Sequence, residues 1–383
     1  MLESQRALFD MPREVCYMNA AAWGPLPRRS QEAGCHGVAR KGQPWTLDPN
    51  LPAEQFARAR KAAAALIGAE PDDIALISSV SYGVATAAKI VPVPKGSRVL
   101  LLENDHSSPV LEWMTRAEAA GFVLDVVRRP EDGDWTASVL EAIARRGAPP
   151  LALASISSVH WSDGGIVDLA RIAAALREAG AALLVDATHS AGAMPLDVKT
   201  LNPDFLVFPT YKWVLGPYGR AFLYVARRHQ DGLPLEQTST GRRGVNAEQT
   251  TYLADTGFVA GARRFDMGER DHFVSLEMAS IGMEMVARWG VPLISERLGW
   301  LTGQLAEGLG NLGVRMPEPH LRAPHILSLG FPKAMPEELI PQLKAVNVHV
   351  AGRLGRMRIS PHVYNDEQDV RAFVSAFGRL LPR

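Results

Sequence analysis

The sequence is poor in cysteine, with only Cys16 and Cys35 among its 383 residues. Two cysteines exclude a disulfide framework and a metal site built from a cysteine cluster, and we assign no metal site. An excess of one charge is also absent, because 41 basic and 41 acidic side chains cancel to a formal net charge of zero. This balance provides neither the basic surface that nucleic acid requires nor a polybasic patch for a membrane.

Long apolar runs are missing as well. No run approaches the roughly 20 residues of a membrane span. The N-terminus, "MLESQRALFDMPREV", carries charges where a signal peptide needs an apolar segment. We therefore expect a soluble, cytoplasmic protein that acts on small molecules. Its length and its 47% hydrophobic content allow a large core and two domains.

Strand-like and helix-like segments alternate through the first two thirds of the chain. Apolar strands are expected over 72–79, 97–104, 150–159, 181–188 and 204–209, and helices over 82–91, 109–121 and 168–180. Several of these strands are apolar throughout, as in a parallel sheet that is covered on both faces. The alternation predicts an α/β fold with a mostly parallel sheet and right-handed crossovers.

The pattern changes after about Tyr252. Long helices are expected over 273–290 and 293–310, followed by short strands over 325–331, 346–352 and 357–365 and a last helix over 366–381. We predict a large α/β domain over residues 1–255, which includes the N-terminal segment, and a smaller α+β domain over residues 256–383.

Polar side chains gather where the predicted strands of the large domain end. They follow five strands and include Ser78, Ser79 and Ser81, Glu103 to His106, Ser157, Ser158 and His160, Asp186, Thr188 and His189, and Thr210 to Lys212. The carboxyl ends of parallel strands open on one edge of a sheet, where ligands bind. Strand ends are often polar simply because loops are wet. That reading accounts less well for a lone lysine and a lone aspartate in apolar stretches.

Lys212 and Asp186 together point to one cofactor. A buried lysine has a lowered pKa and becomes a nucleophilic amine, which forms a Schiff base with a carbonyl group. Pyridoxal phosphate is the main cofactor of this kind, and it needs an anionic partner for its pyridine nitrogen. Asp186, at a neighbouring strand end, would supply that anion.

The stretch "SSVSYG" would hold the phosphate of such a cofactor. It runs from a strand into a helix, and the free N–H groups and dipole of a helix N-terminus favour a phosphate. Ser81 adds a hydroxyl and Gly83 permits close approach. Taken alone, Ser81 is explained as well by a simple helix cap.

The chain resembles the class V aminotransferase family of fold-type I pyridoxal-phosphate enzymes, whose relatives include cysteine desulfurases, isopenicillin N epimerase-like proteins and C–S lyases. The matching segments, in family order, are "YMNAAAWGPLP", "SSVSYGVA", "ENDHSSPVLEW", "VDATHSAGAMPLDV", "FPTYKWVLGPYG", "RRFDMGE" and "MRISPHVYN". The most specific pair is "VDATHSAGA" with "YKWVLGPYG". The resemblance implies a homodimer with active sites at the interface.

The resemblance also implies a role for each matching residue. Lys212 would be the Schiff-base lysine that moves the proton at the substrate α-carbon, and Asp186 would hold the pyridine nitrogen. The other residues that it implies in cofactor binding are His106 on the ring, His189 at the phenolic oxygen, Ser81 and Tyr211 at the phosphate, and also Tyr82 and Ser158. Those implied in substrate binding are Arg358 at the α-carboxylate, Asn19 and Trp23.

Two departures from the family pattern bear on function. The desulfurases carry a reactive cysteine before the C-terminal arginine strand, and "VHVAGRLGRMRIS" has none, which argues against desulfuration through a persulfide. A threonine of the partner subunit often contacts the phosphate after an F-x-x-G turn. Here Glu269 follows that turn, and a carboxylate would repel phosphate.

Arg242 and Arg243 either reach a substrate carboxylate or are solvated, and the solvated reading is preferred.

These features predict a pyridoxal-phosphate enzyme that acts at the α-carbon of an amino acid. Transamination is the preferred reaction, because two-way proton transfer by Lys212 suffices for it. The alternatives are β-elimination of the C–S lyase type, epimerisation, and a protein that binds the cofactor without turnover. Arg358 favours an enzyme over the last of these. The substrate itself stays open, because fold kinship does not decide reaction type.

Overall fold

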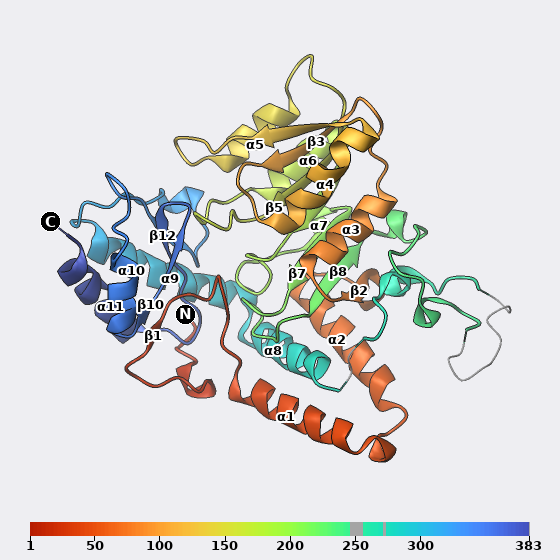
Figure 1. Ribbon diagram of the computed structural model, residues 1–383, viewed down its shortest axis with the longest axis horizontal. Coiled ribbons are helices and arrows are strands. Elements are labelled where there is room, and N and C mark those ends of the chain that lie inside the picture. The colour runs from red at the N-terminus through yellow and green to blue at the C-terminus, as the bar shows by residue number, and fades with distance from the viewer. Residues whose placement is uncertain (246–255, 271–272, 383) are drawn as a thin grey trace.

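The computed structural model describes residues 1–245, 256–270 and 273–382 and is built around a seven-stranded sheet (Figure 1). The strand order is β2-β8-β7-β6-β5-β3-β4. Strands β7, β6, β5, β3 and β4 run parallel to one another, and β8 is antiparallel to both β7 and β2. The strands are β2 (Ile74–Ile77), β3 (Arg98–Leu102), β4 (Val123–Val127), β5 (Leu151–Ser157), β6 (Ala182–Asp186), β7 (Phe205–Pro209) and β8 (Ala221–Val225).

Both faces of the sheet are buried, as the apolar strands predict. Side chains alternate between two cores, so that Leu183 and Val185 of β6 pack on one side and Leu184 on the other. Helices α3 (Val80–Ile90) and α4 (Ser107–Ala120) cover one face. The helices that pack on the opposite face are α2 (Leu51–Ile67), α5 (Trp135–Ile143), α6 (Leu169–Glu178) and α7 (Val198–Leu201).

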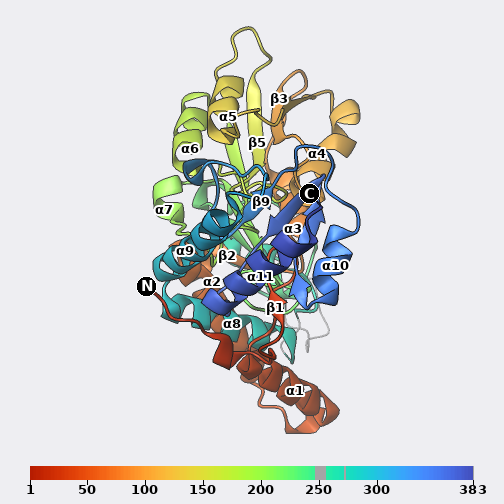
Figure 2. The ribbon, with the colours of Figure 1, turned by 90° about the vertical axis from the view of Figure 1, so that its left-hand side faces the viewer.

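The smaller part of the molecule combines the end of the chain with its beginning. Its elements are α9 (Val291–Leu309), β9 (Leu327–Leu329), α10 (Leu339–Ala345), β10 (Val348–His349), β11 (Ala351–Arg353), β12 (Arg356–Ile359) and α11 (Glu367–Leu380). Strands β11, β12 and β9 form an antiparallel sheet. Near the N-terminus, β1 (Cys16–Tyr17) pairs in parallel with β10. Both views place the N-terminal segment among these C-terminal elements (Figures 1 and 2).

Helix α8 (Ser275–Trp289) connects the two parts. It packs against α1 (Arg28–Gly42) and α2, and α1 extends away from the rest of the molecule in both views (Figures 1 and 2). The predicted domain boundary at residue 255 lies outside the described residues, and the division into residues 1–255 and 256–383 stays a prediction. In the described ranges, none of the helices is long and apolar enough to cross a membrane.

The predicted α/β fold with a mostly parallel sheet is confirmed. Strands β4 and β8 and helices α1, α2 and α5 were not anticipated. The single strand expected over 346–352 was wrong, because the chain there forms two short strands with different partners. Residues of β10 pair with β1, and residues of β11 pair with β12.

Candidate active site

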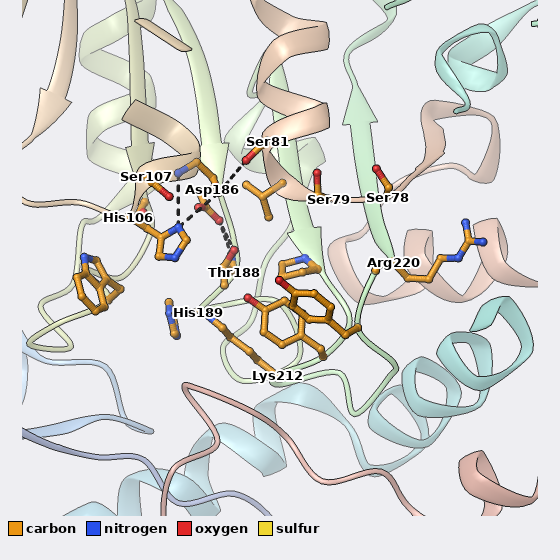
Figure 3. Close-up of a pocket in the computed structure, with 18 residues that line it drawn as sticks. Ser78, Ser79, Ser81, His106, Ser107, Asp186, Thr188, His189, Lys212 and Arg220 are labelled. Atoms are coloured by element: carbon orange, nitrogen blue, oxygen red, sulfur yellow. Dashed lines mark hydrogen bonds between the residues drawn. The ribbon is translucent and has the colours of Figure 1, made fainter. Parts of the chain in front are cut away.

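A cavity of about 380 Å³ opens at the carboxyl ends of the parallel strands. It brings together the five polar strand ends, and its lining includes Ser81, His106, Ser157, Asp186 and Lys212 (Figure 3). The sheet explains this arrangement, since parallel strands deliver their C-terminal residues to the same edge.

Lys212 lies on the loop after β7, and its side chain is buried within this lining. Its Nζ is 3.3 Å from His189 Nε2 and 5.4 Å from the centroid of the Tyr211 ring. Burial, followed by the positive charge of Arg358, lowers the pKa of Lys212 to about 7, although Asp186 opposes the shift. A substantial fraction of the amine is therefore neutral and nucleophilic at pH 7.

His189 is buried beside Lys212 in a defined hydrogen-bonding state. Trp213 Nε1–H donates to His189 Nδ1 at 3.1 Å, so Nδ1 is an acceptor. Burial, together with the charges of Lys212 and Arg358, holds the pKa of His189 well below its usual value, and the ring is neutral. The remaining proton is consequently on Nε2, which faces the lysine amine.

The carboxylate of Asp186 ends β6 and is buried in the cavity lining. One oxygen, Oδ1, accepts the backbone N–H of Thr188 at 2.9 Å and also the Thr188 hydroxyl. These bonds hold the carboxylate in the cavity, near His106 (Figure 3). An anion fixed this way is suited to a protonated ring nitrogen.

Two helix N-termini meet at one end of the cavity. Ser79 caps α3 by accepting the N–H of Tyr82, and His106 caps α4. Ser81 Oγ and Ser108 Oγ lie 3.1 Å apart, between the two helix starts (Figure 3). Free N–H groups, two helix dipoles and clustered hydroxyls make this end of the cavity favourable for a phosphate.

Arg358 approaches the site from β12 of the smaller part. Its side chain is 1% exposed, and its Nη1 donates to the backbone oxygen of Trp161, a lining residue, at 2.6 Å. Its Nε–H is buried without a partner, and so is Oδ1 of Asn19. Burial, then the charge of Arg353, lowers the pKa of Arg358 to about 9, so the group is still charged at pH 7. These unsatisfied groups fit an amino acid carrying a carboxylate.

The N-terminal segment forms one wall near the lysine. Trp23 is about half exposed, and its ring lies 5.4 Å from the ring of Tyr211 and 5.0 Å from that of Tyr218. The N–H of Gly24 donates to the backbone oxygen of Tyr211 at 2.8 Å. A Cβ at position 24 would lie 2.1 Å from the backbone oxygen of Lys212, so only glycine permits this approach.

Two residues expected at the cofactor do not line the cavity. Ser158 lies within 2.6 Å of Ser190, Oγ to Oγ, and both line a neighbouring cavity instead. Its chain neighbour Ser157 takes the place in the lining. Tyr82 packs its ring into the core beneath α3, where burial raises the pKa of its hydroxyl.

Other sequence candidates also lie apart from the cavity. Arg242 stacks on the ring of Phe258, with its Cζ 3.8 Å from the centroid. Neither Arg243 nor Glu269 is among the described residues that line the cavity. Arg220 does line it, but the guanidinium extends away from the other side chains (Figure 3).

Sequence reasoning missed three functional candidates: Trp161, Trp213 and Tyr218. Thr188 was named among the polar strand ends but was given no role. Trp213 was within reach, because it follows Lys212 in a quoted motif. The position of Trp161 depends on the fold of the loop after β5, for which the sequence contains no local signal.

The donor set fits pyridoxal phosphate. Lys212 offers a partly neutral amine to the aldehyde, Asp186 offers a fixed carboxylate to the pyridine nitrogen, and the starts of α3 and α4 suit the phosphate. His106, at the edge of the cavity, offers an aromatic face. Desolvation lowers the pKa of His106, which favours the neutral ring.

Comparison with known proteins supports this interpretation. The family model "Aminotransferase class-V" matches residues 50–373. An uncharacterized aminotransferase of Bacillus subtilis, YcbU, is 28% identical over 315 residues, which cover 82% of this chain and 80% of that protein. A probable cysteine desulfurase of Pyrococcus abyssi is 24% identical, over 99% of this chain and 97% of its own length.

A solved structure extends the similarity to the whole fold. The structure of the cystine C–S lyase C-DES with its product, cysteine persulfide, superposes with a TM-score of 0.85. The match covers 97% of this chain and 99% of that one at 19% sequence identity. The overall fold is therefore shared, whereas the reaction has to be argued from the site.

Proposed function

Since the chain belongs to the class V aminotransferase family of pyridoxal-phosphate enzymes, we propose that it transfers the amino group of an α-amino acid to a keto acid. One observation carries the proposal: the buried Lys212 amine, partly neutral at pH 7, contacts His189 and lines the same cavity as the fixed carboxylate of Asp186.

The cofactor would be held at its two ends and across its ring. Ser81 and the N-terminus of α3 would bind the phosphate, Asp186 the pyridine nitrogen, and His106 would cover one face of the ring. Bound pyridoxal phosphate supplies an aldehyde for the lysine and an electron sink for the α-carbon. We also keep Tyr211 as a candidate near the phosphate, because it lines the cavity.

Lys212 would act as both base and acid. Its amine would take the proton from the substrate α-carbon and return it to a different carbon. A pKa of about 7 suits the amine both to accept and to donate this proton. The Nε2–H of His189 donates toward this amine and favours its neutral form. The Trp213 indole fixes the proton of His189 on Nε2. His189 therefore presents a hydrogen-bond donor, and not an acceptor, to the Lys212 amine that acts as the base.

Arg358 would orient the substrate through its α-carboxylate. A planar guanidinium binds a carboxylate through two parallel bonds, which fixes the direction of the α-carbon as well as its distance. Asn19, whose Oδ1 is unsatisfied, is suited to accept a bond from the substrate ammonium. Trp23 would shield the reacting atoms from water on the N-terminal side.

The competing reactions have less support from these residues. Elimination needs an acid for the leaving group, and epimerisation needs a base on each face of the α-carbon. Among the described residues that line the cavity, Lys212 is the only lysine. β-Elimination stays the second candidate, since the cystine C–S lyase shares the fold.

Desulfuration through a protein persulfide has no support from the cysteines. Cys16 is buried, and its Sγ–H donates to the backbone oxygen of Asp369 at 3.4 Å. Burial raises the pKa of this thiol far from the range of a reactive thiolate. Cys35 is exposed on α1. Neither cysteine lines the cavity.

A panel of single amino acids tests the proposal with the holoenzyme. Transamination converts the bound cofactor to its pyridoxamine form in the absence of a keto acid, and adding pyruvate or 2-oxoglutarate restores the starting spectrum. Release of pyruvate with ammonia would instead establish elimination, and loss of optical activity would establish epimerisation. An unchanged spectrum with every amino acid would refute turnover and favour a binding protein.

We further propose that the enzyme works as a cytoplasmic homodimer, as its family resemblance suggests. Light scattering on the purified holoenzyme measures the mass directly. A mass near 41.6 kDa, that of one chain, would contradict the dimer.

A further inference from the structure

A second arginine, Arg353, lies on the same hairpin as Arg358. In the register of β11 and β12, Arg358 lies opposite Ala351, and Arg353 lies two residues beyond Ala351 on the same face. The two arginines are thus diagonal neighbours, a relation that places Cα atoms roughly 7–8 Å apart. Both point to the same side of the hairpin.

The two guanidinium groups flank one aromatic ring of the cavity. Cζ of Arg353 and Cζ of Arg358 each lie 6.0 Å from the centroid of the Trp161 ring. This ring is held in place because its Nε1–H donates to the backbone oxygen of Asn104 at 2.7 Å. Trp161 lines the cavity, although neither arginine does. Besides burial, the charges of both arginines are felt at Lys212, whose pKa they lower.

The charges of these two arginines are not compensated by the described part of the chain. Arg353 donates only to the backbone oxygen of Gly352, and Arg358 only to that of Trp161. Three buried arginines, by contrast, do have carboxylate partners. Arg60 pairs with Asp266, Arg98 with Asp125 and Arg297 with Glu367.

The two cations also influence each other. After burial, the charge of Arg353 is the next cause that lowers the pKa of Arg358 to about 9. An α-carboxylate would neutralise one of the two, and a net positive charge would be left beside the substrate side chain. A monocarboxylic amino acid therefore leaves Arg353 without an anion.

We propose that Arg353 binds a second carboxylate, so that the substrate is an α-amino acid with an acidic side chain of the aspartate or glutamate type. Arg358 takes the α-carboxylate and Arg353 the side-chain carboxylate. This inference rests on the proposed function, because it assumes that an amino acid occupies the site. It adds a specificity residue on β11 that the reaction itself does not require.

The test measures half-saturation of the cofactor spectral change in the holoenzyme with aspartate, glutamate, asparagine, glutamine and alanine. Aspartate or glutamate should bind at least about tenfold more tightly than the corresponding amide, because the amide cannot form the charged bidentate pair with Arg353. In Arg353→Gln this preference should disappear, because half-saturation for the acid should weaken far more than half-saturation for alanine, and Arg353→Lys should keep part of the preference. Arg356→Gln is the matched control. It removes the same charge from the same hairpin, but its side chain donates to Ser328 Oγ.

Succinate separates the two proposals, since it has two carboxylates and no amino group to react. The dissociation constant of succinate, measured from the change in the cofactor spectrum, should be at least about tenfold lower than that of butyrate in the wild type. In Arg353→Gln succinate should bind no more tightly than butyrate. Equal affinities for succinate and butyrate, or for acid and amide, would overturn the role of Arg353. Tight succinate binding without any amino-acid turnover would refute the proposed reaction and leave the two-arginine site standing.

Discussion

The lowered pKa of Lys212 predicts a stability effect that can be measured without a substrate. In the apoprotein, protonating this buried amine costs free energy that protonating an unfolded lysine does not. Moving the pKa from its ordinary 10.5 to about 7 corresponds to about 5 kcal/mol at about 1.4 kcal/mol per pH unit. The side chain is only 6% exposed, so solvent does little to screen this cost.

The sign follows from proton binding. Between about pH 7 and 10.5 the unfolded chain holds a proton on Lys212 that the folded chain has released. This group therefore makes the free energy of unfolding rise with pH across that window, and its penalty is largest below pH 7. Lys212→Met removes the titration, and the variant apoprotein should be more stable than the wild type at pH 6 by up to about 5 kcal/mol.

Urea denaturation of the two apoproteins between pH 6 and 10 checks this expectation. The stability difference should shrink as the pH rises and should nearly vanish at pH 10. Lys61→Met, at an exposed lysine of α2, is the control and should show no such trend. A difference between wild type and Lys212→Met that stays constant from pH 6 to 10 would refute the neutral-amine argument.

Four further substitutions test the remaining parts of the site. Arg358→Gln should raise the half-saturation for amino acids about 100-fold, because two charge-assisted bonds of about 1.5 kcal/mol each are lost, while the matching decarboxylated amines should be affected little. Asp186→Asn should lower turnover by about 10² to 10³ yet leave a borohydride-reducible bond between cofactor and lysine. Trp213→Phe removes the donor that fixes the tautomer of His189, and it should slow turnover about tenfold and move the pH profile. Gly24→Ala should weaken cofactor binding, measured by fluorescence titration, because its Cβ collides with the loop of the lysine.

Much of the site could be predicted because parallel strands leave little freedom. Once the strands ending near Ser79, His106 and Asp186 are recognised as parallel strands of one sheet, their polar ends must meet at one edge. The cofactor follows from the chemistry of a buried amine and a nearby carboxylate. These predictions need only the order of elements and local composition.

Assignments that depend on the direction of one side chain were less accessible. Successive residues of an extended chain point to opposite sides, so Ser157 faces the cavity and Ser158 faces away. On α3, Tyr82 is about one step of 100° past Ser81 and turns toward the core. A register error of one residue is enough to exchange a ligand for a structural side chain.

Contacts between remote segments were beyond the sequence as well. Arg358 bonds to Trp161, which is 197 positions away, and this contact depends on how the hairpin of β11 and β12 packs against the large sheet. Strand β8 was missed because it follows the lysine loop without an intervening helix, so that it falls outside the strand–helix alternation, and it runs antiparallel to both β7 and β2.

The pairing of β1 with β10 has a consequence for biosynthesis. Cys16 and Tyr17 leave the ribosome long before their partners Val348 and His349. Until those partners emerge, the wall that carries Trp23 and Gly24 lacks this strand pairing, and Gly24 is held by its bond to Tyr211 of the lysine loop. Cofactor capture should accordingly strengthen once β10 has been synthesised.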